Sequence, residues 1–510
     1  MQSMGRLVAF RADASPEIGA GHVMRCLTLA QALQAYGVAC VLLGAPSTAT
    51  WRREIESRGV AFVSLRLEAG ALNVEREPSH SGWASWGQEA DAAATAAALP
   101  RDPDWLIVDH YALDARWERL LRPHAPRIAA LDDLANRSHD ADLLLDQNLQ
   151  TAGRYEGLLM SQARRLLGPR YALIRPAFAQ ARRGATLRGP QLRRIHVFMG
   201  GGDVGAPTLA AIEAVSGPAL RDAALDVVIG AANRGQEAIA RALSGRDNAR
   251  LHVDTPDMAR LMADADLGIG AGGGAALERC VVGLPSVTAP LAPNQEPGLR
   301  ALEAQGATLV APSASAADLG SAVEALACSS DRRRRMEEAA LSVTDGHGAD
   351  RVAAALMAEA AGVTVRLARP NDAALLLRWR NEPSVRALSF SQDEITEESH
   401  LAWFSRALAD PSAVVLIGLV AGRPCGTVRW SVNGDVATAS ITVAPETQGV
   451  GLGSRLLEAA RLDPALPGQA QLLHAWVKPE NQPSRRLFET AGYAPVSEEP
   501  DRVLYARPRA

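Results

Sequence analysis

One stretch near the start of the chain combines glycine and histidine in a pattern that could support acid–base chemistry. Gly19 and Gly21 lie just before His22, with an apolar run at residues 7–10 upstream and an amphipathic run at residues 23–33 downstream. This order predicts a strand, a glycine-rich turn and a helix, and such a turn lets the backbone approach a bound anion. The helix dipole favours the neutral form of His22, which is the form that can act as a general base near pH 7.

The same residues also fit a purely structural interpretation. Many doubly wound folds place a glycine-rich turn between a strand and a helix, and a histidine after such a turn can cap or pack the helix. His22 by itself therefore leaves both a catalytic and a structural role open.

Two further glycine-rich turns occur in the middle of the chain. The strand predicted over residues 195–199 runs into Gly201, Gly202 and Asp203, where backbone N–H groups could form an anion-binding nest. The turn at residues 270–274 follows another predicted strand and precedes a helix, so it could cradle a phosphate in the same way.

The second of these turns contains Gly272 and Gly273 and leads into a predicted helix that carries Glu278 about one turn in. The Glu278 carboxylate could reach ribose hydroxyls, or it could simply be an acid favoured by the helix dipole. Asn294 and Gln295 fall in a loop at a strand end, which is where ligands bind in open α/β sheets.

The elements that must position these residues can be read from the hydrophobic pattern. Short continuous apolar runs, typical of parallel strands covered on both faces, alternate with helical stretches. They predict strands at residues 7–10, 38–44, 105–109, 128–131, 143–145, 195–199, 225–229, 251–253, 267–269 and 285–287. We expect a loop at residues 68–86, a linker at 182–193 and alanine-rich helices over about 316–361.

A third pattern begins near residue 363. Residues 365–368 and 437–443 read as strands, and residues 413–420 and 423–432 as a hairpin around Ala421 and Gly422. The chain is therefore predicted to be an α/β protein with two Rossmann-like halves, residues 1–185 and 186–361, and a small α+β module in residues 362–510.

The composition limits the partners that can be expected. The formal net charge is −4, which argues against a general nucleic-acid or anionic-membrane surface. The five cysteines are scattered without metal-site spacing, so we expect no metal centre, no disulfide framework and a reducing cytoplasm. The N-terminus lacks a signal-peptide pattern, and no run of about 18 apolar residues predicts a membrane span.

The third module carries its own glycine-rich turn, Gln448-x-x-Gly451-x-Gly453, between a predicted strand and a helix. This turn resembles the pyrophosphate-binding turn of the GNAT acetyltransferases, and an Asn-x-x-Ser pair follows some 30 residues later, in the expected order. The resemblance implies that acetyl-CoA is the cosubstrate and is bound by Val443, Gln448, Gly449, Gly451, Gly453, Ser454, Asn481 and Ser484. Asn481 and Ser484 could alternatively cap a helix.

The acid and base of this module stay open. GNAT enzymes often have a tyrosine where this chain has Phe488, so Ser484, Tyr493 or water would have to protonate the leaving thiolate. His474 and Glu446 are candidate bases, although both also fit structural or solvent-facing positions.

Residues 6 to about 350 resemble the UDP-2,4-diacetamido-2,4,6-trideoxy-β-L-altropyranose hydrolases, the PseG enzymes of the pseudaminic-acid pathway. The matching pieces occur in order at residues 11–15, 19–30, 108–111, 132–133, 142–148, 171–176 and 270–285. The resemblance implies a GT-B fold, as in glycosyltransferases such as MurG, followed by the GNAT domain. It implies His22 as the catalytic residue and a UDP-sugar bound by Asp13, Gly19, Gly21, Arg25, Tyr111, Gly201, Gly202, Asp203, Gly272, Gly273, Glu278, Asn294 and Gln295.

In the implied chemistry a water attacks the anomeric carbon, the sugar C–O bond breaks with inversion, and UDP leaves. Asp13 could bind a sugar hydroxyl, hold His22 or cap the turn. Gly202 stands where the family usually has serine.

The opening of the third module, residues 366–372 and 379–386, looks like the PseH acetyltransferases, which acetylate the 4-amino group of the precursor UDP-sugar. The implied protein is a bifunctional enzyme of consecutive steps. The alternatives are a GT-B glycosyltransferase and a C-terminal module that is a protein N-acetyltransferase or a silent binding domain.

Overall fold

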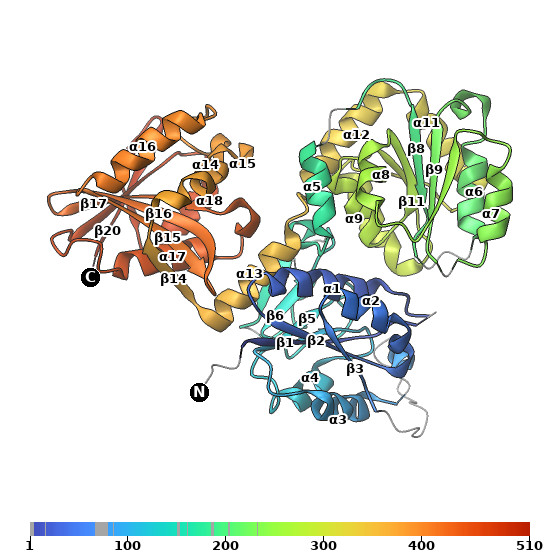
Figure 1. Cartoon of the computed structure of the whole chain (residues 1–510), viewed down its shortest axis with the longest axis horizontal. Helices are drawn as coiled ribbons and strands as arrows, with labels where there is room; N and C mark the ends of the chain where they lie inside the picture. Colours follow the sequence, from blue (N-terminus) through green and yellow to red (C-terminus); the bar gives the residue numbers. More distant parts are fainter. Residues whose placement is uncertain are drawn as a thin grey trace. The chain divides into compact units, whose positions relative to one another are not determined.

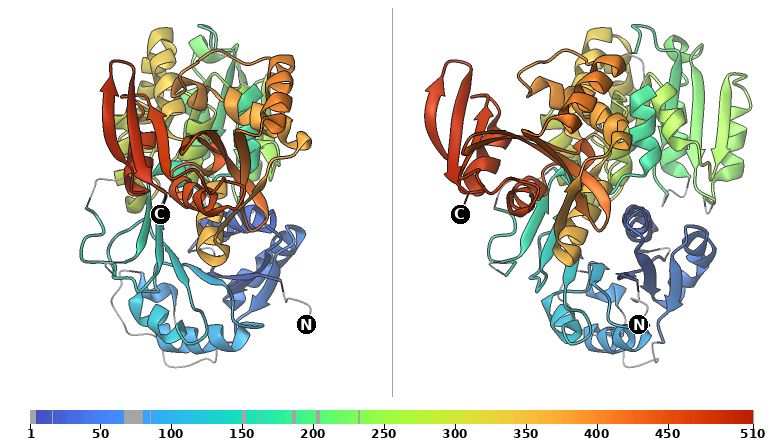
Figure 2. Two further views of the ribbon diagram at one scale, coloured as in Figure 1. Left: turned by 90° about the vertical axis from the view of Figure 1, so that its left-hand side faces the viewer. Right: turned by 60° about the vertical axis from the view of Figure 1, so that its left-hand side comes forward.

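The chain folds into two compact units, Met1–Ala349 and Asp350–Ala510 (Figures 1 and 2). The computed structural model describes residues 5–15, 17–66, 80–84, 86–149, 153–160, 162–184, 188–201, 205–231 and 233–509. The first unit contains two lobes, each built on its own sheet.

The first lobe has a seven-stranded, all-parallel sheet in the order β3-β2-β1-β4-β5-β6-β7. Its strands are β1 (Leu7–Ala12), β2 (Ala39–Gly44), β3 (Ala61–Ser64), β4 (Trp105–Asp109), β5 (Ile128–Leu131), β6 (Leu143–Asp146) and β7 (Arg164–Leu167). Its helices are α1 (Gly21–Gln34), η1 (Pro46–Trp51), α2 (Arg52–Ser57), η2 (Ser81–Trp83), α3 (Gln88–Ala98), α4 (Ala115–Leu121) and η3 (Pro169–Tyr171). Helices α1 and α2 cover one face, and α3 and α4 cover the other (Figure 1).

The strand order of this lobe reverses between β1 and β4. These neighbours pair in register, with Ala12 opposite Asp109 at their carboxyl ends. Open α/β sheets bind ligands in the crevice outside such a reversal point. The fold therefore brings the residues after β1 and at the end of β4 to one place.

The second lobe repeats this plan with six parallel strands in the order β10-β9-β8-β11-β12-β13. The strands are β8 (Arg194–Phe198), β9 (Ala224–Ile229), β10 (Ala249–Val253), β11 (Leu267–Ala271), β12 (Ser286–Ala289) and β13 (Leu309–Val310). The helices are α5 (Pro176–Gly184), α6 (Ala206–Ala214), η4 (Pro218–Leu220), α7 (Gln236–Leu243), α8 (Met258–Asp264), α9 (Gly274–Val281), η5 (Pro293–Gln295), α10 (Glu296–Ala304), α11 (Ala316–Ala327) and α12 (Ser330–Val343). The order reverses here between β8 and β11.

Both Rossmann-like halves are thus confirmed, with differences in detail. Strands β3, β7 and β13 were not predicted because they are short or carry charged residues. The linker expected over residues 182–193 is wrong at its start, since α5 continues to Gly184 and the Arg182 guanidinium donates to three carbonyls of the second lobe. Most of the loop expected at residues 68–86 lies outside the described residues.

The second unit has a seven-stranded sheet in the order β14-β15-β16-β17-β18-β20-β19, in which β17 and β18 form the parallel pair and the other neighbours are antiparallel. The strands are β14 (Val363–Leu367), β15 (Ala413–Val420), β16 (Arg423–Asn433), β17 (Val436–Val443), β18 (Leu472–Val477), β19 (Ala494–Glu499) and β20 (Arg502–Pro508). The helices are α13 (Gly348–Ala361), η6 (Pro370–Asp372), α14 (Ala373–Asn381), α15 (Pro383–Ala387), α16 (Glu397–Ala409), η7 (Pro445–Thr447), α17 (Leu452–Leu462) and α18 (Gln482–Thr490). The expected α+β fold of this module and its hairpin are confirmed, although α13, which was expected to close the second Rossmann-like half, lies almost entirely within this unit.

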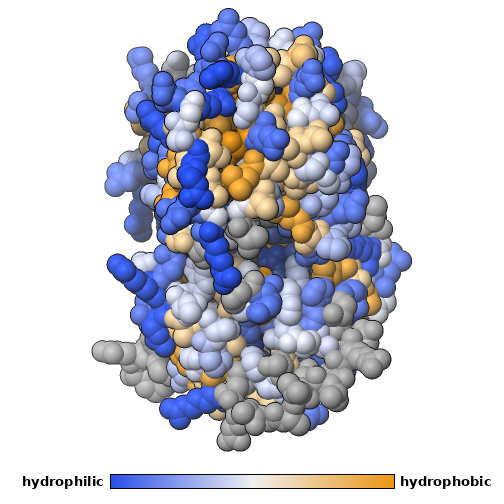
Figure 3. Space-filling view, turned by 90° about the vertical axis from the view of Figure 1, so that its right-hand side faces the viewer, coloured by the Kyte–Doolittle hydropathy of each residue, from blue (hydrophilic) through white to orange (hydrophobic). Residues whose placement is uncertain are grey.

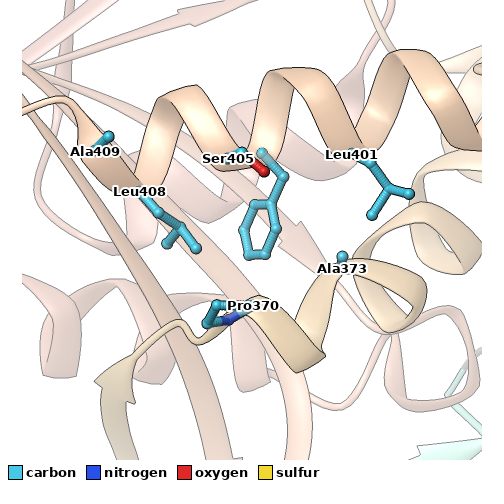
Figure 4. A pocket seen from close by; sticks show the side chains of 7 residues that line it. Pro370, Ala373, Leu401, Ser405, Leu408 and Ala409 are labelled. Atoms are coloured by element: carbon cyan, nitrogen blue, oxygen red, sulfur yellow. The ribbon is translucent and has the colours of Figure 1, made fainter.

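An apolar recess of about 340 Å³ lies between η6 and α16 of this unit (Figure 4). It is lined by Pro370, Ala373, Leu401, Phe404, Ser405, Leu408 and Ala409. Because Ser405 is the one polar side chain among these seven, the recess offers no charged group for catalysis.

The hydropathy of the surface and of the helices bears on the expectation that the chain has no membrane span. On the face shown in Figure 3, apolar side chains gather on the upper part among hydrophilic ones. Within the part of the chain that the structure describes, no helix combines the length and hydrophobicity needed to cross a membrane.

The core of the first lobe buries a charged histidine, and this gives a prediction for stability. His139 lies 2.7 Å from Glu118 through Nδ1 and 3.7 Å from Asp132 through Nε2. Burial alone would lower the pKa of His139, but the two carboxylates outweigh it and raise the pKa from 6.5 to about 9. A raised pKa means that the stabilisation is complete below pH 6.5 and is lost as the pH rises through 9.

We therefore expect His139→Gln to lower the free energy of unfolding by about 3 kcal/mol at pH 6, with a difference that shrinks by pH 9. Urea unfolding at the two pH values measures this. The exposed His124 is the control, because His124→Gln should change stability little at either pH. A His139→Gln deficit that stays constant from pH 6 to pH 9 would contradict the assignment.

Candidate functional site

A histidine–aspartate pair forms where β1 and β4 end. His22 is the second residue of α1 and is 7% exposed, and its Nδ1 lies 2.6 Å from Oδ1 of the fully buried Asp109. With Nδ1–H donating to Asp109, the other ring nitrogen, Nε2, keeps its lone pair and can accept a proton. This arrangement fixes the tautomer and orientation of a general base, as in histidine–aspartate catalysis generally.

Arg25, one turn further along α1, completes the charge balance of the pair. Its guanidinium donates to both Asp109 oxygens at 2.5 Å and to Asp133 Oδ2 at 3.0 Å. Burial would raise the pKa of Asp109, but Arg25 and His22 hold it well below its usual range. Asp109 is therefore ionised when His22 works, and it can stabilise an imidazolium.

Aromatic rings surround the imidazole. The Tyr111 ring packs edge-on against His22 with centroids 4.6 Å apart, and Trp83 stacks on Tyr111 at 5.3 Å. His80 packs against Trp83 at 4.9 Å. Burial and the nearby Asp133 carboxylate raise the pKa of Tyr111 well above its ordinary value, so its hydroxyl stays protonated and can donate a hydrogen bond.

Within the described residues, the Asp13 carboxylate is held by residues of its own lobe and forms no hydrogen bond with His22. The residue that holds His22 is Asp109, so that alternative for Asp13 is wrong. Both Asp13 oxygens pair with Arg11, and the carboxylate also accepts the Ala45 N–H at 2.7 Å. His110 Nε2 lies 3.2 Å from the same carboxylate. Asp13 is 1% exposed, and its contacts favour a structural role, although sugar binding stays a prediction.

The glycines of the first turn leave space at the start of α1. Helix α1 begins at Gly21, and an added Cβ at Gly19 or Gly21 would meet no atom within 4 Å. A ligand can therefore approach the backbone beside His22. Arg25 was predicted to bind substrate, but the structure shows it engaged by two carboxylates of the protein.

In the second lobe, some of the residues predicted to bind the UDP-sugar lie close together. Gly272 packs so closely on Gln295 that a Cβ there would lie 2.9 Å from the Gln295 Cβ. Gly273 has a φ of +77°, which favours glycine at the start of α9. Asn294 lies beside Gln295 in η5. Gly201 is described and its Cβ position is open, but Gly202 and Asp203 lie outside the described residues.

Glu278 of α9 points toward Arg175, whose Nε and Nη2 donate to its Oε1 at 3.1 and 2.9 Å. Burial raises the pKa of Glu278, and Arg175 opposes this shift. Its role in ribose binding stays a prediction.

The carboxylates that organise the site were not identified from the sequence pattern alone. Asp109 and Asp133 were noted only as parts of matching motifs, and Trp83 was assigned to a loop. A usable signal existed, because Asp109 ends a predicted buried strand and a charge at such a strand end faces the ligand crevice. Across the described ranges, no three His, Cys, Asp or Glu side chains group as a metal site.

The glycine-rich turn of the second unit lies between β17 and α17. Gly451 caps α17 in the left-handed region with a φ of +67°, and Gly449 also has a positive φ, +82°. Gly453 is the second residue of α17, where a Cβ would lie 2.2 Å from Leu487 of α18. Gln448 Nε2 donates to the Val443 carbonyl at 3.2 Å, so the side chain fastens the turn to the end of β17.

Asn481, predicted to bind the coenzyme, caps helix α18. Its Oδ1 accepts the Ser484 N–H at 3.1 Å, and its Nδ2 donates to the Leu388 carbonyl. This is the helix-cap alternative that the sequence left open. Glu446 forms an ion pair with Arg378 at 3.0 Å.

Phe488 is 3% exposed and belongs to the core with Tyr493. Ser454 hydrogen-bonds the Gly451 carbonyl, and His474 lies on β18.

Two curated relatives match parts of the chain. One is the spore coat polysaccharide biosynthesis protein SpsG of Bacillus subtilis, 34% identical over 145 residues, which are 28% of this chain and 42% of that protein. The other is the UDP-2,4-diacetamido-2,4,6-trideoxy-β-L-altropyranose hydrolase of Campylobacter jejuni, 24% identical over 261 residues, which are 51% of this chain and 82% of that protein. The chain thus spans less than half of the first relative and most of the second.

Residues 374–493 match the model of the Acetyltransferase (GNAT) family. Similar solved structures include the spermidine N-acetyltransferase of Vibrio cholerae with CoA and spermine, with 18% identity, a TM-score of 0.27, and coverage of 29% of this chain and 95% of that one. A Salmonella typhimurium acetyltransferase, yncA, with acetyl-CoA has 21% identity, a TM-score of 0.26, and coverage of 29% and 94%. The chain therefore joins a region similar to a nucleotide-sugar hydrolase to a region that matches the GNAT family model.

Proposed function

We propose that the first unit hydrolyses a UDP-linked 2,4-diacetamido-2,4,6-trideoxy sugar to the free sugar and UDP. The observation that carries this proposal is the His22–Asp109 pair, which leaves Nε2 of a buried imidazole as a proton acceptor beside an open glycine-rich turn. The similarity to the Campylobacter jejuni hydrolase supports the substrate class.

In the proposed reaction, His22 Nε2 accepts a proton from a water as the water oxygen attacks the anomeric carbon. The bond between that carbon and the β-phosphate oxygen of UDP breaks, and its electron pair leaves with UDP. The configuration at the anomeric carbon inverts. Asp109 stabilises the imidazolium that forms, because it is held ionised by Arg25.

The second lobe is proposed to bind UDP. The backbone N–H groups after β8 and β11 can receive the diphosphate, with Gly272 and Gly273 at the start of α9. As the C–O bond breaks, charge builds on the diphosphate and these dipoles become more favourable.

We propose that the second unit transfers the acetyl group of acetyl-CoA to the 4-amino group of the precursor UDP-sugar. The turn at Gly449, Gly451 and Gly453 would hold the pyrophosphate of the coenzyme. The observation in favour of a sugar acceptor is the fusion itself, because the product of this step is the substrate of the first unit.

The test supplies the full chain with the 4-amino UDP-sugar and acetyl-CoA and follows free acetylated sugar and UDP by mass spectrometry. Both products are expected. An acetylated nucleotide without UDP release would favour a glycosyltransferase that lacks its acceptor. No acetylation of the 4-amino UDP-sugar, with UDP still released when the diacetamido nucleotide sugar is supplied directly, would favour a protein acetyltransferase as the second unit.

A glycine substitution separates the two activities. Gly451→Val places a side chain in a turn with a φ of +67°, and we expect the KM for acetyl-CoA to rise at least about tenfold. UDP release from the diacetamido substrate should not change. Gly434→Val is the matched control, because Gly434 has a φ of +62° in the hairpin at the other end of β17. An equal KM effect of both substitutions would disprove the assignment of the turn.

A further inference from the structure

Arg279 of α9 is a buried charge without a matching anion in the described part of the chain. It is 2% exposed, and its Nη2 donates to the Ala271 carbonyl at 2.6 Å. Its Nε and Nη1 have no hydrogen-bond partner among the described residues. The adjacent carboxylate, Glu278, already pairs with Arg175.

A glycine in strand β11 provides the space that the Arg279 side chain occupies. A Cβ at Gly270 would lie 2.4 Å from Arg279 Nη1 and 2.6 Å from the Phe198 carbonyl oxygen. Glycine at position 270 of the central strand β11 therefore leaves the space that the guanidinium occupies.

A buried, uncompensated cation destabilises the folded chain. Burial lowers the pKa of Arg279 to about 10, but the group remains charged at pH 7. His196 on β8 lies nearby and offers no compensation, because burial and Arg279 lower its pKa to about 3 and keep it neutral. A bound anion from outside the described protein would offset the unfavourable charge of Arg279.

The position of the guanidinium indicates where that anion would bind. Ala271 is the last residue of β11, and residues 272 and 273 connect it to α9, which starts at Gly274. Helical side chains lean toward the helix N-terminus, so Arg279 reaches back under this turn. The buried charge and the N–H groups at the helix start therefore act on the same point.

We propose that Arg279 is a positioning residue that supplies an embedded positive charge for the nucleotide diphosphate at the Gly272–Gly274 turn. The proposal rests on the proposed UDP site. Arg279 acts through the turn rather than by touching the ligand, and the low dielectric of its surroundings lets the charge act over that distance. Its influence should grow as the leaving diphosphate gains charge.

The test measures binding of UDP and of uridine to the full chain by calorimetry, in the wild type and in Arg279→Met, Arg279→Gln and Arg279→Lys. We expect Arg279→Met and Arg279→Gln to weaken UDP binding at least about tenfold and uridine binding less than about twofold. Arg279→Lys should recover most of the UDP affinity. The unfolding temperature of unliganded Arg279→Met should equal or exceed that of the wild type.

Arg333 provides the matched control in the same lobe. It is 5% exposed, and it donates to the Leu326 and Pro190 carbonyls, near the chain segment that enters β8 and not at the carboxyl ends of the strands. Arg333→Met should leave UDP affinity unchanged.

Wild-type UDP affinity in both neutral Arg279 variants would overturn the inference while leaving the UDP site intact. Equal loss of UDP and uridine binding would also overturn it, because that result indicates structural damage rather than a lost charge. A wild-type chain that binds no UDP would overturn both this inference and the proposed function.

Discussion

His22→Asn is expected to reduce UDP release from the diacetamido nucleotide sugar by about 10²–10⁴-fold, which is the usual contribution of a general base. The carboxamide can still donate a hydrogen bond toward Asp109, so the fold and the charge balance around Arg25 should persist. Asparagine cannot take the proton of the attacking water at neutral pH. Steady-state measurement of UDP release gives kcat, and calorimetry with UDP shows whether nucleotide affinity is unchanged.

His124→Asn is the control for a general effect of losing a histidine, since His124 is exposed and lies in the connection between α4 and the start of β5. It should retain wild-type activity. Near-normal UDP release by His22→Asn would exclude His22 as the base, whatever the effect on affinity.

Asp109→Asn is expected to have the second largest effect, also within about 10²–10⁴-fold in kcat. The amide would no longer hold His22 with Nδ1–H as the donor, and it could not stabilise the imidazolium. It would also remove one of the two carboxylates that neutralise Arg25. UDP affinity should change much less than kcat, because Asp109 lies at the histidine and not at the turns of the second lobe.

Asp133→Asn separates these two roles of Asp109. Asp133 pairs with Arg25 at 3.0 Å, but the bond between His22 and Asp109 does not depend on it. We expect its loss in kcat to be at least about tenfold smaller than that of Asp109→Asn. Equal losses in the two variants would show that the balance around Arg25, rather than the histidine–aspartate bond, limits activity.

The sheet cores could be predicted from the sequence because continuous apolar runs are a local signal. β4 and β5 were predicted with the bounds that the structure has, residues 105–109 and 128–131. β7 was missed because its sequence, Arg-Arg-Leu-Leu, is half charged, as an edge strand can be. The end of α5 was missed because Arg182 and Arg183 resemble a polar linker.

The candidate site could be predicted only where its signal is local. His22 follows its own glycine-rich turn, so residue type and spacing were sufficient to select it. Its partner Asp109 is 87 positions away, and only the pairing of β1 with β4 brings the two together. The ion pair of Glu446 with Arg378 could not be predicted either, because the two residues are 68 positions apart in the sequence.

The central claim is that water attacks the anomeric carbon of the UDP-sugar. The most direct measurement is the mass of the UDP released from the diacetamido nucleotide sugar in ¹⁸O-labelled water, without any acceptor. The predicted result is rapid release of unlabelled UDP, because the bond that breaks joins the sugar carbon to the phosphate oxygen. Release of ¹⁸O-labelled UDP would show attack at phosphorus, and no release without an acceptor would show a transferase; either result would contradict the claim.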